Sequence, residues 1–131
     1  MPIETDWGNL EENLVIFKIH GKWTGANFVH AMDNVQALAQ STPHQISLLA
    51  DMRYATVATP QNFTTLLKSY MQRKADCLHR VVVVTHSMYW ERIINIIETS
   101  SDVRFPVPLD FVKSVDEALT ILEHDANIAD D

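Results

Sequence analysis

The sequence predicts an α/β domain with a mixed, mostly parallel sheet of about five strands, four helices and an N-terminal antiparallel hairpin. Short runs rich in Val, Ile and Leu alternate along the chain with longer segments whose apolar residues recur at helical spacing. Residues that can cap a helix precede these longer segments. Strands that alternate with amphipathic helices are typical of parallel pairing with right-handed crossovers, whereas the first two strands follow each other directly.

The first two strands are expected at residues 5–10 and 14–20, separated by a polar turn. The second run has a clear period of two. Its residues on one face are expected to be buried: Val15, Phe17 and Ile19. A helix follows, because Thr24 is a good N-cap and an apolar stripe runs after it. The main members of that stripe are Phe28, Met32, Val35 and Ala39.

Residues 46–51 are expected to form a buried strand that ends in Asp51. A second helix is predicted from Thr59 and Pro60, since proline is favoured at the first helical position. Its apolar stripe is the most regular in the chain: Phe63, Leu66, Leu67, Tyr70 and Met71. We interpret this stripe as core. The alternative is that its end, around Tyr70 and Met71, covers a hydrophobic ligand cavity or a dimer interface.

Residues 81–84, four consecutive valines, predict a strand that is buried on both faces. Ser87 is the expected cap of a third helix. An extended segment at 104–112, broken by two prolines, is expected at the sheet edge. The segment 114–117 predicts a capping box in which the Ser and Glu side chains bind each other's amides. We expect residues 125–131 to form a frayed acidic tail.

The chain has 131 residues, which is long enough for one domain. Its composition excludes several classes of function. The 17 acidic and 10 basic residues give a net charge of −7, which argues against binding to nucleic acid or to an anionic membrane surface. No apolar run is long enough for an integral membrane segment, and no secretion signal precedes the first strand. These features indicate a cytoplasmic protein. We interpret the single cysteine, Cys77, as a structural thiol.

The order and spacing of these segments resemble the STAS domain family, the anti-sigma-factor antagonists with the SpoIIAA-like fold. Four stretches between residues 6 and 124 carry the resemblance: the strand and polar turn 14–24, the strand 46–51 that ends in Asp, the strand 81–84, and the Ser-x-x-Glu-Ala-Leu helix start at 114–119. The resemblance implies a single STAS-like domain over residues 1–131. It also implies a non-enzymatic regulatory or protein-interaction module, in a setting such as bacterial signalling.

One stretch departs from the family pattern. In regulatory members, the strand ending in Asp continues into an Asp-Ser-Ser/Thr-Gly-like stretch whose hydroxyl is phosphorylated by a partner kinase. Residues 51–61 contain neither Ser nor Gly, and the hydroxyl at the helix start belongs to Thr59. A phosphate at a helix N-terminus is stabilised by exposed amides. Thr59 is therefore the candidate phospho-acceptor, and the alternative is that it only caps the helix.

Six residues near the ends of two neighbouring strands form a candidate rim for a ligand or partner. Open parallel sheets bind ligands beyond the carboxyl ends of their strands, near the point where strand order reverses. The candidates are Asp51, Arg53, Tyr54, His86, Ser87 and Tyr89. Arg, Tyr and His side chains beside helix starts could hold an anion. Alternatively, Asp51 and Arg53 form a structural pair and His86 is hydrogen-bonded in a loop.

The sequence contains no motif of a metal, nucleotide or hydrolase site. None of the six histidines stands at metal-ligand spacing, and three glycines are too few for a phosphate-binding loop. We therefore expect no cofactor, no metal and no enzymatic activity. Trp23, in a turn before a helix, either anchors a partner or packs over the helix start.

Three functions are compatible with these observations. The first is the interaction module, which requires a protein partner; a homodimer is also compatible, but the sequence gives no interface. The alternative is a protein that binds a lipid or a small lipophilic ligand, since five Met and five Phe residues could line an adaptable apolar cavity. The third is an enzyme that uses the cluster around Asp51 and His86, for which no reaction can be named.

Overall fold

The computed structural model describes residues 3–56, 63–72, 78–101 and 103–129, with the backbone alone for 124–129. The strands are β1 (Ile3–Trp7), β2 (Leu14–Gly21), β3 (Ile46–Ala55), β4 (Leu78–Val84) and β5 (Leu109–Val112). The helices are α1 (Gly25–Gln40), α2 (Phe63–Gln72), α3 (Tyr89–Ser100) and α4 (Val115–Ala129). The order of these elements confirms the predicted α/β class.

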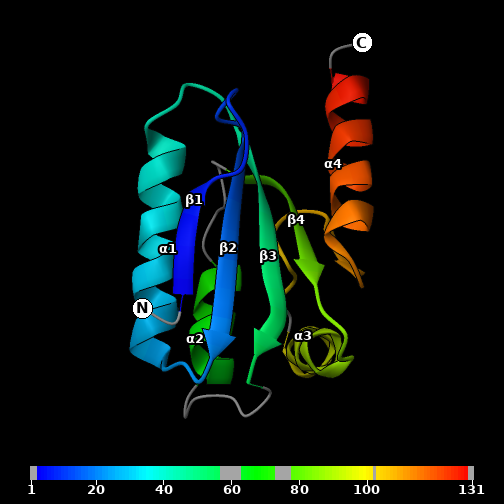
Figure 1. The fold of residues 1–131 in the computed structure, drawn as a ribbon. Helices are drawn as coiled ribbons and strands as arrows, with labels where there is room; N and C mark the ends of the chain where they lie inside the picture. Colours follow the sequence, from blue (N-terminus) through cyan, green and yellow to red (C-terminus); the bar gives the residue numbers. More distant parts are fainter. Residues whose placement is uncertain (1–2, 57–62, 73–77, 102, 130–131) are drawn as a thin grey trace.

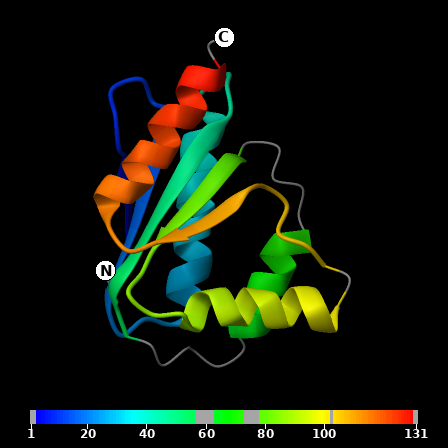
Figure 2. The ribbon, with the colours of Figure 1, turned by 90° about the vertical axis from the view of Figure 1, so that its right-hand side faces the viewer.

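The strands form one mixed sheet in the order β1-β2-β3-β4-β5. β1 is antiparallel to β2, and the other neighbours are parallel. Because each right-handed crossover advances in the same direction, α1, α2 and α3 lie on one face, while α4 lies on the other (Figures 1 and 2). The expectation of a reversal in strand order is wrong for the described strands, since spatial order follows sequence order.

The alternating side chains of the strands divide the core between these two faces. Val15, Phe17 and Ile19 of β2 are buried under the helices α1 to α3, as predicted. The opposite face packs against α4 in a smaller cluster, whose buried members are Leu14, Leu49, Val82, Val84, Ala118 and Leu122. The strand of four valines is buried on both faces, which confirms the prediction for residues 81–84.

Aromatic rings fill much of the space between the sheet and helices α1 to α3. Phe63 packs edge-on against Trp23 at 5.0 Å between ring centroids and against Phe28 at 5.2 Å. Trp23 is buried, and its indole Nε1 donates to the Thr56 carbonyl oxygen at 3.4 Å. Trp23 therefore packs over the helix start, and its interpretation as an exposed partner anchor is wrong.

Two helix starts show how the predicted caps operate. Thr24 caps α1 in a full capping box, because its hydroxyl accepts from the Asn27 amide and the Asn27 side chain accepts from the Thr24 amide. At α4, the Ser114 hydroxyl accepts from the Glu117 amide as predicted. The Glu117 carboxylate, however, accepts from the Lys113 amide, one residue before the expected partner.

Several element boundaries differ from the prediction. β1 begins and ends earlier than expected, because the Gly8 amide donates to the Leu14 carbonyl oxygen and closes the hairpin there. β3 continues past Asp51 to Ala55, paired with β2. The backbone of α4 remains helical to Ala129, beyond residue 125, where a frayed tail was expected. The predicted start of the second helix at Thr59 and Pro60 lies outside the described residues.

Candidate functional site

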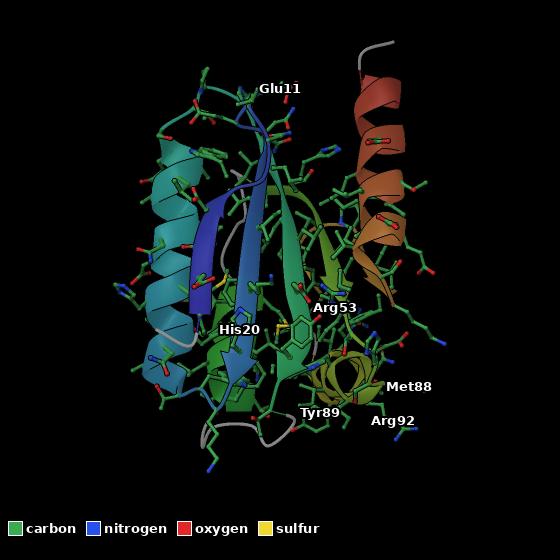
Figure 3. The ribbon with its side chains drawn as sticks, viewed as in Figure 1. Glu11, His20, Arg53, Met88, Tyr89 and Arg92 are labelled. Carbon is green, nitrogen blue, oxygen red and sulfur yellow. The ribbon has the colours of Figure 1, made fainter. Side chains whose placement is uncertain are left out.

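Helix α4 covers only part of its face of the sheet. It packs over β4 and β5 and near the amino end of β2, and leaves the carboxyl ends of β2 and β3 uncovered (Figure 1). The N-terminus of α3 reaches the same end of the sheet (Figure 2). Side chains from β2, β3 and the start of α3 form a surface that we call the rim: His20, Arg53, Met88, Tyr89 and Arg92 (Figure 3), together with Tyr54, whose ring stacks on that of His20.

A β-bulge in β3 positions the centre of the rim. Lys18 of β2 pairs with Asp51, but His20 pairs with Tyr54, so β3 has one extra residue between these pairs. Such a bulge interrupts the alternation of side chains and re-aims them. As a result, the consecutive residues Arg53 and Tyr54 both belong to the open face, while Met52 is buried in the core on the other side.

Asp51 forms a largely buried ion pair with Arg53 of the rim. The Arg53 Nε and Nη2 atoms donate to the two Asp51 carboxylate oxygens, each at 2.9 Å, and the Arg53 amide donates to Oδ1 at 3.2 Å. Burial alone would raise the pKa of Asp51, but the Arg53 hydrogen bonds and charge outweigh it and hold that pKa below its usual value. The structural pairing considered from the sequence is therefore present.

The aromatic ring of Tyr54 links the pair to β2. The Arg53 guanidinium carbon lies 5.1 Å from the centroid of the Tyr54 ring, a cation–π distance. The His20 ring stacks on Tyr54 at 6.0 Å with only 7° between the planes. Although held by these contacts, Tyr54 remains 56% exposed. The network therefore presents an ordered aromatic ring to solvent.

The turn between β4 and α3 supplies the remaining candidates. Helix α3 begins at Tyr89, and Ser87 caps it from outside the helix, because its hydroxyl accepts from the Tyr89 amide at 3.1 Å. His86 is exposed in this turn. Met88, which sequence reasoning missed, is 62% exposed, and the missed Arg92 is also exposed on the first turns of α3. An apolar residue left exposed at a helix start carries no sequence signal that separates it from core.

Two predicted features lie outside the described residues: the candidate phospho-acceptor Thr59 and the thiol of Cys77. Among the residues that the structure does describe, no three His, Cys, Asp or Glu side chains gather in a way that could hold a metal ion. Within the same residues, no helix is both long and apolar enough to cross a membrane.

A second feature lies on the opposite face, between the sheet and helices α1 to α3. It is an apolar cavity of about 210 Å³. Its lining includes Tyr70 and Met71, the two residues for which the sequence left a cavity as the alternative to core. Its floor is formed by the middle of β3 and β4, so the sheet separates it from Arg53 and Tyr54 at the centre of the rim.

Comparisons with known proteins identify the fold. Models of known protein families and curated proteins give no match to this chain. A solved structure is similar: an uncharacterized protein of the DUF3478 family with a SpoIIAA-like fold, from Shewanella loihica PV-4. The similarity covers 92% of this chain and 91% of that one, with 18% identical residues and a TM-score of 0.63. The chain therefore has the STAS or SpoIIAA-like fold that the sequence predicted.

Proposed function

We propose that this SpoIIAA-like domain is a non-enzymatic module that binds an acidic segment of a protein partner through the rim. The observation that supports the proposal is the composition of the rim. It combines two Arg, two Tyr, a Met and a His on a chain of net charge −7. Tyr, Met and Arg are enriched at protein interfaces, and Tyr and Arg are enriched among the residues that dominate binding energy.

The order of the rim also favours binding. Tyr54 is held between Arg53 and His20, so little side-chain freedom remains to be lost when a partner covers it. The nearest acidic group in the network, Asp51, is 2% exposed and paired with Arg53. Its charge is therefore neutralised locally, and the exposed Arg92 can attract an acidic partner. That attraction would weaken as salt concentration rises.

The proposal extends to regulation at Thr59, four residues after β3 ends. A phosphate on Thr59 would place negative charge in the segment that continues from the rim strand. Such a charge would repel an acidic partner that binds the rim. We therefore expect Thr59→Glu to weaken partner binding, whereas Thr59→Ala should leave it close to wild type.

Site-specific photo-crosslinking tests the proposal in cells that naturally produce the chain. A benzoylphenylalanine at Tyr54 should capture one discrete protein, and the same group at Glu11, at the opposite end of the sheet (Figure 3), should not. The captured protein, once purified, should bind the wild-type chain and lose roughly tenfold or more affinity for Tyr54→Ala. Equal capture from both positions, or capture of only a second copy of this chain, would contradict the proposal.

A further inference from the structure

At the middle of β3 and β4, the two faces of the sheet differ in how closely they are covered. Ala50, Met52 and Val83 face helices α1 to α3 and keep 8%, 9% and 9% of their surface accessible. On the other face of the same strands, Leu49 and Val82 keep 1% and 0%. Since β3 and β4 are interior strands, this difference is not an edge effect. It marks the floor of the apolar cavity, which all three more accessible residues line.

The chemistry of the lining restricts what the cavity can hold. None of the described residues that line it has a charged side chain, and polar side-chain atoms come from Gln36, Tyr70 and Trp90. An ion placed there would lose its hydration without gaining a partner of opposite charge. The lining also includes three methionines, Met32, Met52 and Met71, whose flexible thioethers adapt to apolar ligands.

We propose that this cavity is a binding site for a compact, uncharged apolar molecule. Its volume of about 210 Å³ exceeds the roughly 150 Å³ of a cavity that binds benzene, and is below the 300–1,000 Å³ typical of drug-sized ligands. Among the lining residues, Gln36 of α1 and Pro106 before β5 are exposed to solvent. The proposal does not depend on Arg53 and Tyr54 at the centre of the rim, which lie on the other face of the sheet.

Methionine methyl NMR of the full chain tests this site directly, with octan-1-ol as the probe and octanoate as its charged counterpart. Octan-1-ol should shift the methyl signals of Met32, Met52 and Met71 saturably. The exposed Met88 lies outside the cavity, and its signal should not move. Octanoate should bind roughly tenfold more weakly or worse, because its carboxylate finds no cation in the lining.

Two matched variants locate the binding. Ala50→Leu adds side-chain volume on the cavity floor and should weaken octan-1-ol binding by roughly tenfold or more. Ala37→Leu makes the same chemical change at an exposed position of α1 outside the lining and should leave binding unchanged. If Ala50→Leu does not fold, Val83→Ile fills less of the cavity and should still weaken binding measurably.

Three results would overturn this proposal. The first is the absence of saturable shifts at the three cavity methionines with octan-1-ol. The second is octanoate binding as tightly as the alcohol. The third is unchanged affinity in a folded Ala50→Leu or Val83→Ile variant. None of these results bears on partner capture at Tyr54, so the failure of one proposal can be told apart from the failure of the other.

Discussion

Replacing Arg53 with leucine should destabilise the domain strongly at neutral pH. The substitution removes two hydrogen bonds of 2.9 Å to a carboxylate whose side chain is only 3% exposed. Breaking a buried pair by removing one partner costs about 3–5 kcal/mol. Because the Arg53 side chain is itself 23% exposed, we expect a value near the lower end, about 3 kcal/mol. That is a large fraction of the 5–15 kcal/mol typical of a folded domain.

The pH dependence of this loss follows from Asp51. In the wild type, its pKa lies below the usual 3.8, so the pair contributes fully above that pH and is lost as pH falls through the folded-state pKa. In Arg53→Leu, burial remains without the arginine, and the pKa of Asp51 should rise above its unfolded value. The variant then gains stability relative to wild type as Asp51 takes up a proton. The difference in unfolding free energy should therefore shrink between pH 7 and pH 4.

Urea unfolding at both pH values measures these differences, with Arg92→Leu as the matched control. The control removes an exposed arginine and should stay within about 0.5 kcal/mol of wild type. The double variant Asp51→Leu/Arg53→Leu should recover at least half of the loss, since no unpaired charge remains. A buried pair with these properties is contradicted if Arg53→Leu is as stable as the control at pH 7, or if its loss of unfolding free energy is as large at pH 4 as at pH 7.

Three further substitutions test the fold and the cavity. Thr24→Ala removes the α1 cap and should lower the unfolding free energy by about 1 kcal/mol in urea; no change would mean that the capping box contributes nothing. Gly21 has φ of 65° with open space at its Cβ position, so Gly21→Ala should lose roughly 1 kcal/mol from backbone strain alone, and equal stability would contradict that origin. Ala50→Leu should raise the unfolding free energy by up to about 2 kcal/mol by filling the cavity, and a lower melting temperature would show that the site cannot take the added carbons.

Much of the fold could be predicted because local patterns and tertiary structure agree. The period of two in residues 14–20 and the four valines of β4 each define which faces are buried, without reference to any other part of the chain. The caps at Thr24 and Ser114 are likewise local, since each hydroxyl meets an amide three residues later. The order of the strands in the sheet could not be predicted in this way, because it depends on the side of the preceding strand on which each crossover places the next strand.

The rim was predicted only in part, and for His20 the reason is the bulge in β3. Sequence alternation places Arg53 and Tyr54 on opposite faces of a regular strand. The extra residue between the pairs Lys18–Asp51 and His20–Tyr54 puts both on one face and brings His20 to them. Pairing register between strands far apart in sequence carries no local signal, so His20 was missed. The cavity could be predicted only as an alternative to core at Tyr70 and Met71. The reason is that an apolar stripe has the same sequence pattern whether it packs against core side chains or against a ligand.

The most direct test of the interaction module is the affinity of the purified cross-linked partner for two single variants. Tyr54→Ala removes the exposed ring at the centre of the rim, and Glu11→Ala changes an exposed residue at the far end of the sheet. Calorimetric titration should show a dissociation constant at least roughly tenfold higher for the first variant and a wild-type value for the second. Equal dissociation constants for both variants would contradict binding through the rim.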